Sequence, residues 1–189
     1  GVVALDGAAV ESLSEEVAEL SRLIEDLRIL AEADAAGLRI RREPVDLAEV
    51  ASRAAARLAP FFVERGVHLD LQLGATKVLG DTDRLEQVVI NLLSNAAKFS
   101  APGSEVLLRV AVEQGEGRLV VADHGRGIPP DEHGRIFDRF YRGAAAGGTS
   151  GSGIGLAVVS LLVAAHGGRI SLSSSVGDGS VFTVHLLAA

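Results

Sequence analysis

Apolar residues recur at alternating spacings of three and four over the first part of the chain. The positions are Val10, Leu13, Val17, Leu20, Ile24, Leu27 and Ala31. This heptad pattern predicts a long helix with an apolar seam, which a partner helix from another chain or from a segment outside this sequence would cover. The alternative is a helix that packs on its own domain. Gly37 would end the helix, and residues 39–44 would form a short linker.

After the linker, the periodicity of apolar residues changes repeatedly between the helical and the extended type. The expected elements are a helix that starts at Leu47 and stops at Gly66, a strand over 67–73, a helix over 84–98, a hairpin over 105–122, a helix over 154–165 and a hairpin over 169–187. Asp46 is the expected N-cap of the first of these helices, and Pro60 kinks or interrupts it. Either Asp81 or Asp83 caps the next helix, with Glu86 completing a capping box for Asp83. This order predicts an α+β two-layer sandwich, a mixed sheet with helices on one face.

The composition narrows the class of protein. The 189 residues suit one domain with an appendage, and 48% of them are apolar, enough for a substantial core. The net charge of −7 and the dispersed basic residues disfavour nucleic acid as a partner. The chain has no Cys, which fits a reducing compartment and predicts a cytoplasmic location, although the parent protein could be anchored in the membrane. It also has no Met, and we expect it to be a fragment of a longer protein.

A glycine-rich segment in the second half of the chain carries the candidate chemistry. Asp123 follows the apolar run 119–122, and a carboxylate at a strand end can accept a hydrogen bond from a ligand amine. Gly125 and Gly127 would let the backbone pass close to a flat ring. The run 151–155 directly precedes a predicted helix, where free backbone N–H groups bind anions. An amine-binding carboxylate combined with a phosphate-binding loop predicts a purine nucleotide as the ligand.

The glycines do not fit the two commonest nucleotide-binding motifs. No Lys follows them, as a Walker A loop requires, and about 25 residues separate the two glycine groups, unlike in a Rossmann fingerprint. A connection of this length predicts a lid, loosely ordered over residues 126–150 until nucleotide binds. The aromatic stretch 136–142 would anchor it through Phe137 and Phe140.

One face of the helix over 84–98 is polar. Asn91, Asn95 and Lys98 are spaced so that their side chains point in the same direction. A solvated helix face is the ordinary explanation, but Asn is a poor helix former, and Glu or Lys would serve water better. Two amides and an ammonium group suit a Mg²⁺–phosphate group, with an oxygen for the metal and a cation for the phosphate.

Four motifs together resemble those of sensor histidine kinases. The run NLLSNAAKFS over 91–100 looks like the N box of that family, DHGRGIP over 123–129 like its G1 box, IFDRFYR over 136–142 like its F box and GSGIGLAVV over 151–159 like its G2 box. They occur in the family's order and spacing, and the resemblance covers about residues 44–189. It implies the Bergerat ATP-binding fold of the GHKL superfamily, as a catalytic domain over 43–189. The heptad helix within residues 1–42 resembles the second helix of the family's dimerisation and histidine-phosphotransfer hairpin.

The resemblance implies a role for each candidate residue. Asp123 would bind the adenine amine. The catalytic group would comprise Asn91, Asn95, Lys98, Arg139 and Arg142. Within it, Asn95 would ligate Mg²⁺ with Asn91 close by, Lys98 would contact phosphate, and a lid arginine would reach the γ-phosphate. Further nucleotide contacts would come from Gly125, Gly127, Ile128, Phe137, Tyr141, Gly151, Ser152, Gly153, Ile154, Gly155 and Leu156.

One departure from the family matters for function. The H box with the phosphoacceptor histidine is absent, and none of the five histidines takes its place. The implied activity is donation of the γ-phosphoryl group of Mg²⁺–ATP to a histidine on a hairpin of the parent kinase, in two-component signalling. The parent would form a homodimer through the heptad helix and serve a response regulator. The chain alone would not autophosphorylate.

Two other functions remain open. Chaperone, mismatch-repair and topoisomerase ATPases share the fold. They resemble one another in having a Glu as general base on the helix, at the position where this chain has Asn91. An amide cannot take a proton from water, which disfavours hydrolysis, whereas transfer to a positioned imidazole needs only alignment and charge stabilisation. The other alternative is a nucleotide-gated interaction module, a pseudokinase whose lid movement is the output.

Overall fold

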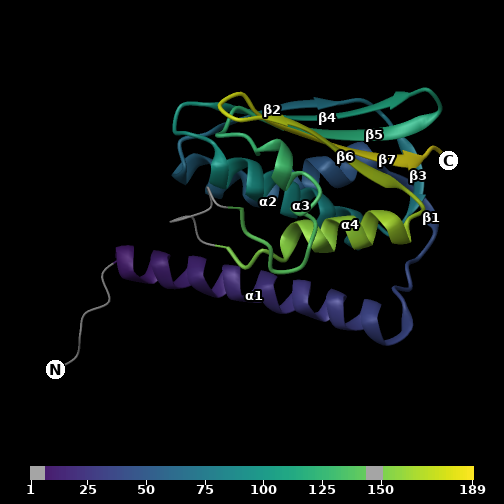
Figure 1. The fold of residues 1–189 in the computed structure, drawn as a ribbon, viewed down its shortest axis with the longest axis horizontal. Coiled ribbons are helices and arrows are strands. Elements are labelled where there is room, and N and C mark those ends of the chain that lie inside the picture. The colour runs from purple at the N-terminus through teal and green to yellow at the C-terminus, as the bar shows by residue number, and fades with distance from the viewer. Residues whose placement is uncertain (1–6, 144–150) are drawn as a thin grey trace. The chain divides into compact units, whose positions relative to one another are not determined.

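The computed structural model describes residues 7–143 and 151–189 (Figure 1). The chain forms two compact units, one up to Gly37 and one from Leu38 onward. The first unit holds the long helix α1 (Gly7–Ala36), which confirms the helix predicted from the heptad pattern. None of the helices in the described ranges has the length and apolar character that a membrane span requires.

The second unit is a two-layer sandwich. Its elements in chain order are β1 (Glu43–Asp46), α2 (Leu47–Glu64), β2 (His68–Leu73), β3 (Lys77–Gly80), α3 (Thr82–Phe99), β4 (Glu105–Glu113), β5 (Glu116–Asp123), the short 3-10 helix η1 (Pro130–Glu132), α4 (Gly155–Ala165), β6 (Arg169–Ser175) and β7 (Gly179–Leu187). A five-stranded sheet has the order β2-β4-β5-β7-β6, with β2 and β4 parallel and the other neighbours antiparallel. Helices α2, α3 and α4 cover one face of this sheet (Figure 1). The predicted α+β sandwich with a mixed sheet is confirmed.

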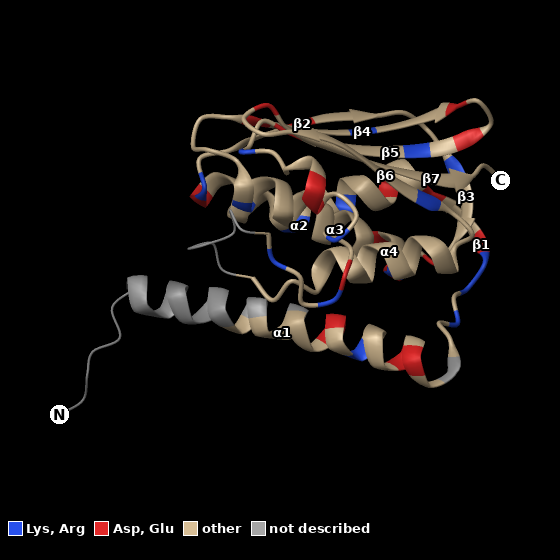
Figure 2. Cartoon of the chain, viewed as in Figure 1, with Lys and Arg blue, Asp and Glu red and all other residues tan. Residues whose placement is uncertain are grey.

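Alternation of buried and exposed residues along the strands builds the core. The inward residues of β4 and β5 are buried, among them Val106, Leu108, Leu119 and Val121. Burying an aliphatic side chain of this size is worth about 1.5–3 kcal/mol relative to leaving it exposed. Acidic and basic residues are interspersed over the elements of the second unit (Figure 2).

Two strands were not predicted. Strands β1 and β3 pair with each other as a separate antiparallel sheet. Of the two effects expected of Pro60, interruption is wrong, because Pro60 lies inside α2 and the helix continues to Glu64, just before the predicted stop at Gly66.

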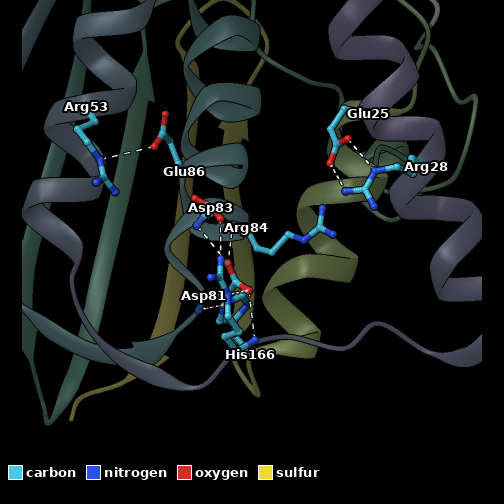
Figure 3. A network of polar contacts seen from close by, with 9 residues as sticks. Glu25, Arg28, Arg53, Asp81, Asp83, Arg84, Glu86 and His166 are labelled. Carbon is cyan, nitrogen blue, oxygen red and sulfur yellow. Dashed lines mark hydrogen bonds and ion pairs between the residues drawn. The ribbon is translucent and has the colours of Figure 1, made fainter.

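Asp81, rather than Asp83, caps α3. Its carboxylate accepts hydrogen bonds from the N–H groups of Asp83 and Arg84, at 3.1 and 3.3 Å. The capping box predicted for Asp83 is therefore wrong. Glu86, its expected second member, instead forms an ion pair with Arg53 of α2 at 3.6 Å (Figure 3).

Asp81 also makes hydrogen bonds with two segments of the second unit that are distant in the sequence, one at Arg41 and one at His166. Its carboxylate accepts hydrogen bonds from the backbone N–H and the Nε–H of Arg41, both at 3.2 Å. Its backbone N–H donates to Nε2 of His166 at the end of α4, at 3.0 Å (Figure 3). The Nδ1 of His166 donates to the carbonyl of Leu162 at 2.7 Å, so Nε2 carries no proton. Burial lowers the pKa of His166, which keeps the ring neutral in this structural role.

Asp81→Ala should lower the free energy of unfolding by about 1–2 kcal/mol, because N–H groups in the first turn of α3 lose their acceptor. Burial alone would raise the pKa of Asp81, but hydrogen bonds from Arg41 and Arg84 outweigh it and hold that pKa below its usual range. The stabilisation should therefore be present above about pH 4 and be lost as the pH falls through the folded pKa. Asp83→Ala, the matched control, removes an exposed partner of Arg41 and should cost at most about 0.5 kcal/mol. Urea unfolding measures both, and equal losses would contradict the assignment of the cap.

Candidate nucleotide-binding site

Asp123 ends β5 on the face of the sheet that the helices cover. The residue is only 8% exposed, and its carboxylate accepts a hydrogen bond from the Gly125 N–H at 2.9 Å. Burial raises the pKa of the Asp123 carboxyl, although the N–H groups of Gly125 and Ser180 oppose this rise by stabilising the charged form. A carboxylate has about four acceptor positions, so two N–H donors leave room for a donor on a ligand.

Gly125 and Gly127 form a tight loop between α3 and the hairpin of β6 and β7. A Cβ at Gly125 would lie 2.4 Å from the carbonyl oxygen of Phe99, the last residue of α3. Gly127 has a φ of 70°, and a Cβ there would lie 1.8 Å from the carbonyl oxygen of Ser175. Glycine is thus required at both positions by the protein's own backbone. Close approach to a ligand ring, the role expected from the sequence, stays a prediction.

Gly127→Ala should destabilise the protein by about 2–4 kcal/mol, because the new methyl group meets a backbone carbonyl in a left-handed conformation. Gly134→Ala is the matched control, since no heavy atom lies within 4 Å of its added Cβ. That control should stay within about 0.5 kcal/mol of the unaltered chain. Thermal unfolding followed by circular dichroism measures the difference. Similar values for the two variants would mean that the loop can move away from the hairpin at little cost.

The polar stripe of α3 is not a solvated face. Asn91 is only 6% exposed, and its Nδ2–H donates to the carbonyl oxygen of Gly155 at 3.3 Å. Asn95 and Lys98 follow on the same side of the helix and are half-buried. At Asn91 the stripe therefore faces the start of α4, and none of the three side chains is fully exposed, which favours the functional interpretation of the two asparagines.

The run from Gly151 to Gly155 leads into α4. The helix begins at Gly155, with Ile154 at the N-cap position, and no described side chain caps its first turn. Gly153 has a φ of 72°, and a Cβ there would lie 2.7 Å from the carbonyl oxygen of Tyr141. The turn thus packs against the lid stretch, while N–H groups at the start of α4 suit an anion.

The connection between β5 and α4 has defined structure in its first part. The rings of Phe137 and Phe182 pack edge to face, with their centroids 6.5 Å apart. Phe140 is 65% exposed, and it is held through its backbone, because its N–H donates to the carbonyl of Gly153 at 3.0 Å. Of the two predicted anchors, only Phe137 packs through its ring. Residues 144–150 of the predicted lid lie outside the described part of the chain.

The lid carries arginines close to its aromatic residues in the sequence, and Arg135 also lies against an aromatic ring. Arg139 and Arg142 are both exposed. The guanidinium group of Arg135 lies over the ring of Tyr141, 4.4 Å from its centroid. One face of that ring is thus covered by Arg135, so a nucleotide contact from Tyr141 would use the ring edge, the hydroxyl or the other face.

Residues of the β6–β7 hairpin that border Asp123 were not predicted. A Cβ at Gly179 would lie 1.9 Å from the carbonyl oxygen of Asp123. The hydroxyl of Ser174 accepts a hydrogen bond from the Ile128 N–H at 2.8 Å. A signal was present in the sequence, because Ser174 and Ser180 occupy inward positions where the alternation of each strand requires an apolar residue.

Comparisons with known proteins show the family to which this chain belongs. Residues 80–189 match the family described as histidine kinase-, DNA gyrase B-, and HSP90-like ATPase. The signal transduction histidine-protein kinase/phosphatase MprB of Mycolicibacterium smegmatis is 40% identical over 175 residues, which are 91% of this chain and 35% of that protein. The chain thus spans about a third of the length of the curated relatives it matches.

Solved structures agree with the sequence matches. The histidine kinase AdeS of Acinetobacter baumannii superposes with a TM-score of 0.77 at 30% identity, over 99% of this chain and 87% of that one. Full-length ShkA in complex with AMPPNP gives a TM-score of 0.81 at 31% identity, over 100% of this chain and 40% of that one. The chain therefore belongs to the histidine kinase-, DNA gyrase B- and HSP90-like ATPase family, and within it to the sensor histidine kinases.

Proposed function

We propose that this chain binds Mg²⁺–ATP and donates the γ-phosphoryl group to a histidine of its parent sensor kinase. One observation carries the proposal: α3 contacts both of the segments that are expected to bind the two ends of a nucleotide. At its C-terminal end, the carbonyl of Phe99 packs against Gly125, next to Asp123. About two turns earlier, the side chain of Asn91 contacts Gly155 at the start of α4. The polar stripe of α3 thus runs between an amine-binding carboxylate and a helix N-terminus.

Different site residues bind the different parts of the nucleotide. Asp123 accepts a hydrogen bond from the adenine amine, and the N–H groups of 151–155 hold the phosphate chain. Asn95 offers an oxygen to Mg²⁺, Lys98 balances phosphate charge, and an arginine of the lid reaches the γ-phosphate. No three His, Cys, Asp or Glu side chains gather as a metal site in the described ranges. The metal would therefore take oxygens from an amide, the phosphates and water, as Mg²⁺ commonly does.

One observation favours ATP over other ligands, and a second favours phosphoryl transfer over hydrolysis. ShkA, which resembles this chain with a TM-score of 0.81, was solved with the ATP analogue AMPPNP. Asn91 carries an amide where a water-activating base would be needed, and an amide cannot take a proton from water. Transfer to an imidazole needs no such base, because the acceptor nitrogen is itself the nucleophile.

The partners follow from α1 and from the missing acceptor. The seam residues Val17, Leu20, Ile24 and Leu27 are 60%, 58%, 67% and 47% exposed. An apolar heptad seam of this kind favours a partner helix, and we propose that a second copy in a homodimer of the parent supplies it. The phosphoryl group would pass from the parent's histidine to a response regulator.

Labelled phosphate distinguishes the three candidate functions. The chain is incubated with γ-labelled ATP and a separate fragment that carries the parent's histidine-bearing hairpin. Acid-labile label on the hairpin is the expected result. ATP binding without any label on the hairpin would favour the nucleotide-gated interaction module. Release of free phosphate without the hairpin would favour an ATPase.

A further inference from the structure

Three polar side chains form a row on the covered face of the sheet. Asp123 on β5 lies directly opposite Ser180 on β7, and Ser180 lies directly opposite Ser174 on β6. The next residues on the same face of β7 are the buried apolar Phe182 and Val184. Three neighbouring strands thus place a hydrogen-bonding group at the same level, where the apolar core gives way to the candidate site.

The Ser174 hydroxyl makes three hydrogen bonds. Its Oγ lies 2.8 Å from the backbone nitrogen of Ile128, 2.8 Å from the carbonyl oxygen of Gly179 and 3.0 Å from the Oγ of Ser180. A backbone N–H can only donate, and a carbonyl can only accept. The single proton of Ser174 must therefore go to Gly179, and its oxygen accepts the other two hydrogen bonds. One of the accepted protons is that of Ser180.

This arrangement fixes the hydroxyl of Ser180. Its one proton is given to Ser174, so it offers only lone pairs to a ligand. Its backbone N–H is directed at the carboxylate of Asp123. A carboxylate likewise offers only lone pairs. The corner formed by Asp123 and Ser180 therefore presents hydrogen-bond acceptors and no side-chain donor.

We propose that Ser174 is a positioning residue that sets purine selectivity by holding the Ser180 hydroxyl as an acceptor. This inference rests on the proposed function, the binding of an adenine nucleotide beside Asp123. Adenine carries an amine at its 6-position, which donates, whereas hypoxanthine and guanine carry a carbonyl oxygen, which only accepts. Two acceptors match the amine but leave a 6-carbonyl unpaired and repelled. Without Ser174, the Ser180 hydroxyl would rotate and donate to that carbonyl.

ITP is the sharpest probe, because it differs from ATP only at the 6-position and the adjacent N1 and lacks the 2-amino group of GTP. Calorimetric titration with Mg²⁺ present gives the ratio of the Kd for ITP to the Kd for ATP. Ser174→Ala should lower this ratio roughly fivefold to tenfold, the factor that corresponds to one neutral hydrogen bond. Ser173→Ala is the matched control, because the preceding residue of β6 projects from the opposite, exposed face. It should leave the ratio unchanged.

A double-mutant cycle separates positioning from a general structural effect. In a Ser180→Ala background, Ser174→Ala should no longer change the ratio, because no hydroxyl remains to be oriented. A change of the same size in both backgrounds would overturn the inference, and so would an unchanged ratio in the single variant. If Ser174→Ala does not fold, Ser174→Cys keeps a similar volume with a much weaker donor and acceptor. The ratio of the Kd for ITP to the Kd for ATP in that variant then tests the inference in the same way. Failure of the unaltered chain to bind ATP would refute the proposed function itself, whereas normal ATP binding with an unchanged ratio refutes only this inference.

Discussion

Asp123→Asn should abolish the rise in melting temperature that Mg²⁺–ATP produces in the unaltered chain. At a hundred times its Kd, a ligand that binds only the folded state stabilises it by about 2.7 kcal/mol, or roughly 5–10 °C for a protein of this size. An amide at position 123 keeps one carbonyl oxygen but replaces the other oxygen with a donor. That donor must then face either the N–H groups of Gly125 and Ser180 or the adenine amine, so one of these hydrogen bonds is lost. Scanning fluorimetry measures the shift.

Asp70→Asn is the matched control for this prediction. Asp70 lies on β2, which β4 separates from β5, and its carboxylate accepts a hydrogen bond from Gln72 at 2.9 Å. The ATP-induced rise should persist in this variant. GTP should give no comparable rise in the unaltered chain, and an equal rise with GTP would show that Asp123 does not select the adenine amine. A full ATP-induced rise in melting temperature in Asp123→Asn would show that the carboxylate of Asp123 does not contribute to nucleotide binding.

The features predicted correctly depend on residues that are close in sequence. Asp46 caps α2 by accepting the Ala48 N–H at 2.9 Å, a contact across two positions. The apolar side of α3 is buried, as its helical period requires, with Leu85, Val88 and Leu92 each 1% exposed. Caps and periodicity act over one or two turns, and a single sequence contains them completely.

The features that were missed depend on partners far along the chain. Strands β1 and β3 have four residues each and pair only through the fold, so neither is long enough for a recognisable alternation. Asp81 and Asp83 are equivalent as local caps. The choice of Asp81 coincides with hydrogen bonds to Arg41 and His166, which lie 40 and 85 positions away.

The same distinction applies to the candidate site. Asp123, the glycines and the two asparagines of α3 belong to continuous motifs, which is why they could be proposed from the sequence. Ser174 holds the loop after Asp123 through Ile128, across 46 positions, and belongs to none of the four motifs. Its signal was a polar residue at an inward strand position, which becomes informative only when the neighbouring strand is known.

The chain's own histidines are poorly placed to accept a phosphoryl group. In-line transfer needs the attacking nitrogen about 3 Å from phosphorus. His166 and His185 are buried and hydrogen-bonded, and His133 contacts a backbone carbonyl through its Nε2 at 2.9 Å. His68 lies on β2 and His124 directly follows β5. Label from γ-labelled ATP should therefore appear only when the histidine-bearing hairpin is added, and acid-labile label on this chain alone would contradict that expectation.

Asn95→Ala should reduce transfer to the added hairpin by about a hundredfold or more, because Mg²⁺ would no longer be held where it neutralises the departing diphosphate. Asn95 is half-buried and lies one turn after Asn91, whose side chain contacts Gly155 at the start of α4. Gln87→Ala is the matched control, since Gln87 lies one turn before Asn91 on α3 and has no assigned role at the nucleotide. It should transfer at close to the normal rate. The measured quantity is the initial rate of acid-labile labelling at saturating Mg²⁺–ATP. A normal rate in Asn95→Ala, with its dependence on Mg²⁺ intact, would place the metal ligand elsewhere in the chain.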